Sequence, residues 1–465
     1  MFKKPKISFF ALVLLIVSAV DSNRNLPSAA IFGSPLIFFF VFSAIFFLFP
    51  VSLVSAELGA GSPRSGGVYH WVRLAFGEKM GMIAIWLQWM QAVAFYPTIL
   101  SFLAGTGAYL FKPDLMYSKL YMFIAIVGIF WLLTFVNLWG LKLSSLVNEI
   151  CCLVGTLVPM VALIIFAAIW IFLGKPLQIS LSLPSMIPSF RSFGEWTSLV
   201  AIITSFTGME LAGVHLSSVE NPKRYFPQAM RVASLVVFGT MLCGSLAIAM
   251  ILPSHYIHLA GGLMQVFAAF FKAFHLDAWI IVFSLMIVLG SLGNLINWIL
   301  SPAKGLLHAS EYGYLPDYFT RVNKKGAASR ILIAQAVLVT LSCALFLFLP
   351  SVNAFYWFLM AISSTIYMFM YILMFFSAIR LHRKNPAQSF QVPFGKFGLF
   401  FICGLGFIGS LVTIIVGFIP PPGIPIASPL KYALMVAAGN FLLICPVFYL
   451  FYWKNRHYKK AKNKS

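Results

Sequence analysis

The stretch LVLLIVSAVDSNRNLPSAAIF (12–32) begins as an apolar run and is then interrupted by five polar residues, Asp21 to Asn25. A second stretch, SLVAIITSFTGMELAGVHLSS (198–218), is interrupted in a similar way by Gly208 and Glu210. Polar groups at membrane depth are costly, so those that occur there usually mark functional sites. These two stretches therefore decide what kind of fold to expect and where its site lies.

The composition of the whole chain is that of a membrane protein. Hydrophobic residues make up 61% of the 465, charged residues 9%, and the mean hydropathy is +0.94. A soluble domain carries about a quarter charged residues. Apolar runs of about 20 residues, enough to cross roughly 30 Å of hydrocarbon, recur along the chain. Because lipid forces each segment to satisfy its own backbone polar groups, we expect helices and an all-α polytopic membrane protein.

We expect about twelve membrane-spanning helices in a single transporter domain that covers 1–465. Short Pro/Gly or charged stretches separate these helices, and residues 454–465 form a short basic cytoplasmic tail. The predicted spans are 7–32, 34–56, 81–111, 118–138, 146–173, 196–219, 228–252, 278–301, 330–350, 353–379, 397–419 and 430–453.

The net charge of +21 arises from 32 Lys and Arg residues against 11 Asp and Glu residues, and the placement of the basic residues explains it. With an even number of spans, most of them fall in segments on the same side as both termini. Cytoplasmic loops carry such an excess, so we expect both termini in the cytoplasm. The basic charge then needs no nucleic-acid partner. The expected partners are the lipid bilayer and a small-molecule substrate, and a homodimer is left open.

The sequence gives no sign of a metal site or a cofactor. The six cysteines include no CxxC pair, so they indicate neither a disulfide framework nor a metal site. No HExxH, G-x-S-x-G or phosphate-binding G-x-x-x-x-G-K-[ST] motif is present. We therefore expect no cofactor, no enzymatic activity and no ATP-driven transport by this chain alone.

The two interrupted stretches are the first and the sixth predicted spans, which is the pattern of inverted-repeat transporters with discontinuous helices at the membrane midplane. A broken helix frees N–H groups at the start of one half-helix and C=O groups at the end of the other. The positive end suits a carboxylate and the freed carbonyls suit an ammonium group. The paired breaks therefore predict a central site for a zwitterion such as an amino acid.

The charged residues at these breaks each have two interpretations. Asp21 and Arg24 lie three residues apart, so on a helix they would neutralise each other; otherwise they are free to bind substrate. Glu210 either caps the second half-helix or contacts substrate. Glu149 is either solvated near the cytoplasmic interface or a proton-coupling carboxylate.

Four aromatic residues near the expected site also remain open. Phe206, Trp298, Tyr356 and Trp357 are either packing residues or aromatic gates. With aromatic content at 16% of the chain, packing is the default for each of them.

Five motifs resemble known families. GMELAGVHLSSVENPKRYFPQAM (208–230) resembles the sixth-helix signature of the amino acid–polyamine–organocation superfamily. GGVYHWVRLAFG (66–77) and SPAKGLLHASEYGYLPDYFTRVNKKGAASR (301–330) resemble its segments between helices two and three and after helix eight. LPSHYIHLAGGLMQVFAAFF (252–271) and SLGNLINWILSPAKG (291–305) are similar to the bacterial glutamate/GABA antiporter family.

The resemblance implies a LeuT-type fold, in which helices 1–5 (7–173) and inverted helices 6–10 (196–379) precede helices 11 and 12 (397–453). It implies an amino acid/amine antiporter of the bacterial inner (plasma) membrane that works by alternating access. A proton-coupled amino acid symporter is the alternative, and a transporter-like membrane sensor is an alternative of a different class. The first segment is retained as helix one, so we expect no cleaved signal. The short tail leads us to expect no cytoplasmic plug.

The resemblance also places the candidate site residues. It puts the helix-one break at Val20, Asp21 and Ser22 and the helix-six break at Phe206 to Met209. The candidate substrate-binding residues are Val20, Asp21, Ser22, Asn23, Arg24, Thr204, Ser205, Phe206, Thr207, Gly208, Met209 and Glu210. The gating or coupling candidates are Glu149, Asn294, Asn297, Trp298, Tyr356 and Trp357.

One departure from the superfamily concerns the first break, where many members have small residues. Asp21 stands there, with Arg24 one turn on. A carboxylate in that place repels a substrate carboxylate unless Arg24 compensates for it. The sequence therefore does not name the amino acid.

Overall fold

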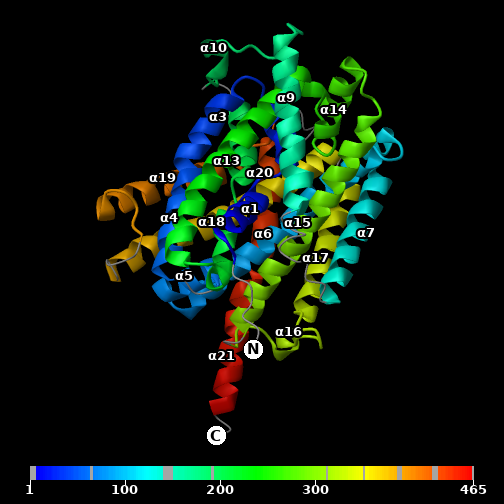
Figure 1. The fold of residues 1–465 in the computed structure, drawn as a ribbon. Helices are drawn as coiled ribbons and strands as arrows, with labels where there is room; N and C mark the ends of the chain where they lie inside the picture. Colours follow the sequence, from blue (N-terminus) through cyan, green and yellow to red (C-terminus); the bar gives the residue numbers. More distant parts are fainter. Residues whose placement is uncertain are drawn as a thin grey trace.

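The computed structural model describes residues 7–62, 66–139, 150–189, 193–310, 313–348, 351–384, 390–421 and 428–462. Its regular structure in these ranges is helical, apart from a single bridge between Ile7 and Val219. The prediction of an all-α protein is confirmed. Figure 1 shows the helices as an elongated bundle, with α10 (Leu183–Met186) at one end and α16 (Asp317–Thr320) and α21 (Pro446–Lys462) at the other.

The helices of the first part of the chain, up to Phe172, include two short π-helical turns and one 3₁₀ turn. They are α1 (Phe9–Val20), α2 (Asn25–Ala30), α3 (Leu36–Ser43), η1 (Ala44–Leu48), α4 (Phe49–Gly61), α5 (Gly67–Phe76), α6 (Glu78–Ala108), η2 (Pro113–Tyr117), α7 (Lys119–Leu138), η3 (Leu153–Leu157) and α9 (Val158–Phe172).

The remaining helices follow α10. They are α11 (Phe193–Trp196), α12 (Ser198–Ser205), η4 (Met209–Ser218), α13 (Pro222–Ile251), η5 (Ser254–Tyr256), α14 (Gly262–Ala273), α15 (Trp279–Ser310), α16, α17 (Ser329–Phe348), α18 (Val352–Lys384), α19 (Gly395–Val416), α20 (Pro429–Ile444) and α21.

Ten helical segments in the described ranges are long and apolar enough to cross a membrane, which confirms a polytopic membrane protein. They are Leu36–Gly61, Glu78–Ala108, Lys119–Leu138, Ile150–Phe172, Gly194–Ser218, Pro222–Ile251, Trp279–Ser310, Val352–Arg383, Gly395–Val416 and Pro429–Lys454. Each overlaps one predicted span. Of the other two predicted spans, 7–32 is divided into α1 and α2, and 330–350 contains the shorter apolar stretch Ser329–Ala344.

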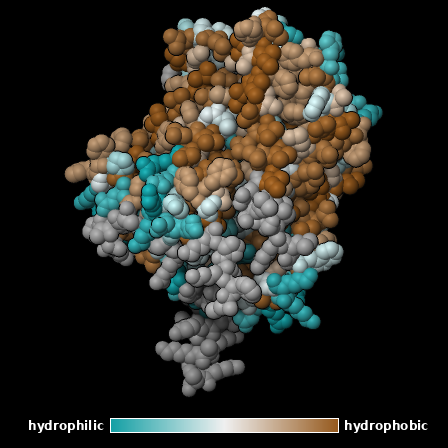
Figure 2. All heavy atoms as spheres, in the orientation of Figure 1, coloured by the Kyte–Doolittle hydropathy of each residue, from teal (hydrophilic) through white to brown (hydrophobic). Residues whose placement is uncertain are grey.

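The outside of the bundle carries large apolar side chains, as a surface facing lipid must. Leu120 on α7, Leu235 on α13 and Leu341 on α17 are each more than 60% exposed. Figure 2 shows hydrophobic residues over much of one face, with hydrophilic residues gathered toward its lower part. By contrast, α6 is almost wholly buried and packs against α15 and α18, so it forms the centre of the bundle.

The two interrupted segments lie side by side and run in opposite directions. The half-helix α1 packs along η4, and α2 packs along α12. The Ile7 N–H donates to Ser218 O at 2.8 Å, and the Glu220 N–H donates to Ile7 O at 3.0 Å. The segments are therefore joined at their ends as well as at their breaks. This arrangement positions both breaks for one shared site.

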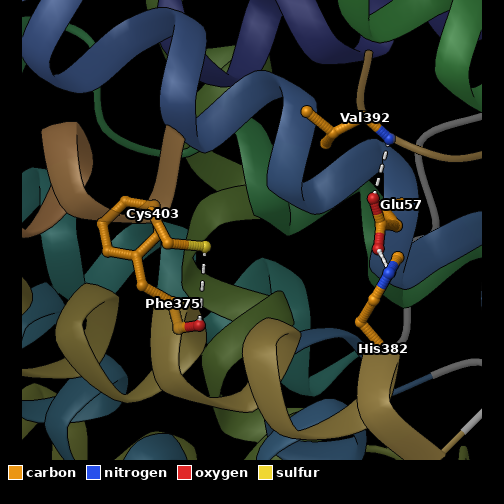
Figure 3. A network of polar contacts seen from close by, with 5 residues as sticks. All are labelled: Glu57, Phe375, His382, Val392 and Cys403. Carbon is orange, nitrogen blue, oxygen red and sulfur yellow. Dashed lines mark hydrogen bonds and ion pairs between the residues drawn. The ribbon is translucent and has the colours of Figure 1, made fainter. Parts of the chain in front are cut away.

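A buried polar contact fixes α18 relative to α4. Figure 3 shows Glu57 of α4 pointing toward His382 of α18 and toward the backbone of Val392, which precedes α19. The Nδ1 atom of His382 lies 2.7 Å from Glu57 Oε1, and the Val392 N–H donates to Oε2 at 2.8 Å. Cys403 of α19 also donates to the carbonyl of Phe375 on α18, at 3.7 Å. These contacts hold in place the helix that presents two tyrosines to the second break.

Candidate functional site

The first break lies where the sequence predicts it. Helix α1 ends at Val20, and Asp21 has an extended backbone with φ −70° and ψ 119°. Residues 21–24 are not helical, and the Asn25 N–H donates to Ser22 O at 3.0 Å as α2 begins. The polar run therefore interrupts the helix instead of continuing it, which exposes backbone groups at membrane depth.

The second break centres on Gly208, which follows the end of α12. Its φ of 108° is a conformation that side-chain-bearing residues rarely adopt. A Cβ atom here would also lie 3.1 Å from the Ala19 carbonyl oxygen and 3.4 Å from the Trp298 ring. Glycine is thus required both for the turn and for the close approach of the two breaks. Beyond it, the chain continues as a 3₁₀ helix of ten residues, longer than that form usually runs.

A cavity lies where the two breaks meet. Helix α6, the π-helical turn η3 and helix α15 complete its wall. The lining residues are Ser18, Ala19, Val20, Asp21, Ser22, Asn23, Arg24, Asn25, Phe95, Ile99, Thr156, Thr204, Thr207, Ser291 and Trp298. Of the residues predicted from sequence, Val20, Asp21, Ser22, Asn23, Arg24, Thr204, Thr207 and Trp298 are among them.

Arg24 is a buried cation in the wall of this cavity, with 1% of its side chain exposed. Its Nη1 donates to the hydroxyl of Thr98, and its Cζ lies 4.2 Å from the centroid of the Phe95 ring. Its Nε and Nη2 have no hydrogen-bond partner in the described structure. A guanidinium group with two unsatisfied donors in a cavity is suited to receive an anion.

Asp21 is also buried, but it does not pair with Arg24. Its Oδ2 accepts from the Thr240 hydroxyl of α13 at 2.8 Å, and its Oδ1 has no partner among the described residues. Asp21 and Arg24, both described, form no ion pair within 4.0 Å. Breaking the helix removes the spacing at which residues three apart would meet. The structure thus disfavours internal neutralisation, the first interpretation of these two residues.

Asn23 ties the first break to the fifth predicted span. Its Nδ2 donates to Gly155 O at 3.0 Å, within the π-helical turn η3. A π-helical turn departs from the regular α-helical ladder, and such turns are frequent at functional sites. Thr156 in the same turn lines the cavity.

Glu210 lies beside the second break but not in the cavity wall. Its carboxylate accepts hydrogen bonds from the Tyr367 hydroxyl and, at 2.5 Å, from the Tyr371 hydroxyl, both on α18. The amide of Gln88 on α6 lies 3.5 Å away. The Gly208 N–H donates to the Tyr371 hydroxyl at 2.8 Å. Tyr371 thus joins the carboxylate to the freed backbone of the break, a contact that supports the structural interpretation of Glu210.

Three further predicted residues of the second break lie behind the cavity. The Ser205 hydroxyl donates to Ile202 O at 2.6 Å. Phe206 is fully buried, with its ring centroid 5.8 Å from that of Phe40. Met209 is fully buried in the core. In this structure these side chains pack or bond within the protein.

The remaining gating candidates either do not line the cavity or lie outside the description. Tyr356 and Trp357 of α18 belong to another buried cluster, although Tyr356 lies near enough to interact electrostatically with Arg24. Trp357 packs edge-on against Phe32 with centroids 6.0 Å apart. Glu149 lies outside the described residues. Asn294 and Asn297 lie on α15, but their side chains are outside those described.

Several residues that build the site were missed by the sequence reasoning. They are Phe95, Thr98, Ile99, Thr156, Thr240, Ser291, Tyr367 and Tyr371. Two signals were available for some of them. Tyr367 and Tyr371 are four residues apart, so they share a face of an apolar helix. Thr98 follows Pro97, a proline inside a long helix.

The chain is similar to known transporters over most of its length. A family model described as amino acid permease matches residues 7–440. An uncharacterized transporter of Legionella pneumophila is 39% identical over 443 residues, which are 95% of this chain and 95% of that protein. A glutamate/gamma-aminobutyrate antiporter of Lactococcus lactis is 29% identical over 427 residues, 90% of this chain and 85% of that protein.

A solved structure has the same fold. The manganese transporter of Eremococcus coleocola matches with a TM-score of 0.59 at 13% identity. The match covers 97% of this chain and 94% of that chain. At this identity the likeness speaks for the fold and not for the substrate.

Proposed function

Because this chain belongs to the amino acid permease family, we propose that it is a secondary active antiporter that exchanges an amino acid for an amine product by alternating access. The observation that carries the proposal is the polar cavity between the two helix breaks, with a buried guanidinium group and a buried carboxyl group in its wall. Discontinuous helices that meet at a central site are the construction of carriers of this type.

The paired charges of the cavity favour a zwitterion as substrate. Arg24 offers two free donors and Asp21 one free acceptor, both away from bulk water. A buried charge without a partner is destabilising, so a substrate with opposite charges at its two ends stabilises both residues when it binds. An amino acid has that charge distribution.

Exchange is favoured by the similarity of this chain to a known antiporter. The Lactococcus lactis relative is a glutamate/gamma-aminobutyrate antiporter and matches 90% of this chain. We propose that this chain also works by exchange. We further propose that it forms one transporter domain with five-plus-five inverted helices. We also propose that both termini face the cytoplasm, because that orientation places most Lys and Arg residues inside.

Counterflow in proteoliposomes tests the proposal. Purified protein is reconstituted into vesicles loaded with one amino acid, and uptake of labelled amino acids and amines is followed with and without a pH gradient. Uptake that requires an internal substrate is expected for exchange. Uptake into empty vesicles driven by an inward proton gradient alone would indicate symport. Lack of uptake across a broad panel would overturn the proposed function.

A further inference from the structure

We propose that Arg24 is a fixed anchor for a carboxylate group and that every molecule carried by this site must therefore bear a carboxylate. The inference rests on the proposed function and specifies its site. It predicts a strict rule of selectivity: amines without a carboxylate are excluded, even where their ammonium group and carbon chain are unchanged.

The free atoms of Arg24 have the right geometry for this role. Nη1 is occupied by the Thr98 hydroxyl, whereas Nε and Nη2 have no partner in the described structure. Nε and Nη2 are adjacent on one edge of the planar guanidinium group, and their N–H bonds are parallel. That edge is the fork that binds both oxygens of a carboxylate. Nη1 thus holds the side chain in place through Thr98, while Nε and Nη2 form a complete edge that can bind a carboxylate.

The guanidinium group is held in place by α6. Thr98 contacts its Nη1, and the Phe95 ring lies 4.2 Å from its Cζ. Phe95 and Thr98 are three residues apart, so they project from the same face of this buried helix. Phe95 also packs against Trp298 of α15, with ring centroids 5.3 Å apart. A cation supported in this way loses little freedom when it binds an anion, which favours affinity and selectivity.

Among the residues that the structure describes, no carboxylate takes the free edge. Asp21, three residues earlier, is bonded to Thr240 on α13 and forms no ion pair with Arg24. Glu210 is bonded to two tyrosines of α18. With these two carboxylates engaged elsewhere, we infer that the cargo supplies the anion for Arg24. The free Oδ1 of Asp21 remains for an ammonium group of the same molecule.

The rule has a consequence for exchange. An α-amino acid with one carboxylate loses it on decarboxylation, so its amine product could not bind Arg24. Exchange of a substrate for its decarboxylated product would then require a second carboxylate on the substrate.

Matched pairs of competitors test the rule directly. Alanine, leucine and glutamate are each compared with their α-amides, and γ-aminobutyrate with butylamine, as inhibitors of the strongest counterflow found. An α-amide keeps the ammonium group and the side chain but replaces the charged carboxylate with a neutral carboxamide. For the pairs whose acid inhibits, the acid should act at roughly ten- to hundredfold lower concentration, the ratio expected for charge-assisted hydrogen bonds.

Variants assign that ratio to Arg24. Arg24→Gln should bring the ratio close to one, and Arg24→Lys should keep part of it because the charge remains but the fork is lost. Thr98→Val leaves the charge of Arg24 in place but removes the hydroxyl that supports it, so the ratio should fall by less than in Arg24→Gln. This variant keeps the inference testable if Arg24→Gln fails to insert into the membrane. Arg383→Gln, at an exposed position on α18, is the control and should leave the ratio unchanged.

The results separate this inference from the proposed function. If counterflow is found but acids and amides inhibit it equally in the parent protein, the anchor is overturned and the proposed function stands. An unchanged ratio in Arg24→Gln would have the same meaning. If no counterflow is found, the proposed function fails. The anchor is then tested by thermal denaturation. The acids, unlike their amides, should raise the melting temperature of the purified parent protein, and they should not raise that of Arg24→Gln.

Discussion

Replacing Glu210 with glutamine should loosen the second break from α18 while leaving the lining of the cavity unchanged. The carboxylate accepts hydrogen bonds from both Tyr367 and Tyr371, and Tyr371 in turn accepts one from the Gly208 N–H. A glutamine presents one oxygen and one NH₂ group. The NH₂ group would face a phenol hydrogen, so one of the two strong hydrogen bonds must be lost.

The magnitude follows from the kind of bond. A hydrogen bond to a charged group contributes a net 1.5–3 kcal/mol. Since all three side chains are buried, solvent cannot replace the lost bond. We expect Glu210→Gln to lower the free energy of unfolding by about 2–3 kcal/mol. Tyr371→Phe should cost a similar amount, and the two changes together should cost less than their sum because they remove the same contact.

Denaturation of the purified variants in mixed micelles, followed by tryptophan fluorescence, measures these free energies. Counterflow by the same preparations should slow, because the backbone of the break is no longer held through Tyr371. Tyr449→Phe, a change at an exposed position on α21, is the control for removal of a phenol. Additive losses in the double variant, or a Glu210→Gln variant with parental stability and exchange rate, would refute the reasoning.

Three further outcomes follow from single contacts. Gly208→Ala should abolish counterflow, because its φ of 108° and the Ala19 carbonyl 3.1 Å from the new Cβ both oppose a side chain; parental counterflow rates would contradict this. Burial lowers the pKa of His258 from 6.5 to about 4, so the folded state favours its neutral form. The free energy of unfolding that this preference contributes is present above pH 6.5 and is lost as the pH falls toward 4, in all about 3 kcal/mol. Denaturation at pH 7 and at pH 4 should therefore show a smaller fall in the free energy of unfolding for His258→Gln than for the parent protein. Asp21→Asn keeps an acceptor for Thr240 but removes the negative charge, so half-maximal counterflow should require about tenfold more amino acid; an unchanged requirement would exclude Asp21 as an ammonium partner.

The fold could be predicted because lipid leaves few choices. The length of an apolar run and the need to form a helix depend on local sequence, and ten predicted spans each overlap a helix long enough to cross a membrane. The break at Asp21 was also visible locally, since its polar run contradicts the apolar pattern around it. The family comparison confirms the resemblance to the amino acid–polyamine–organocation superfamily. The relatives are transporters, as expected for a chain without catalytic motifs.

The partners of the break could not be predicted, because they come from distant helices. Thr98 lies 74 residues from Arg24, and Thr240 lies 219 residues from Asp21. A single hydroxyl in an apolar helix looks the same in the sequence whether it bonds its own backbone or a distant charge. Sequence spacing left neutralisation of Asp21 by Arg24 as one of two interpretations, and that interpretation assumes the continuous helix that the break removes.

The same separation explains why the site contains both charges. If the helix continued through Asp21 and Arg24, each would satisfy the other and neither would recognise a substrate. The break turns the two side chains toward different supports, Thr240 on α13 and Thr98 on α6. Each support uses one polar atom and leaves others free in the cavity wall. On the proposed function, unwinding the helix therefore replaces an internal ion pair with two unfilled binding positions, which a zwitterion would complete.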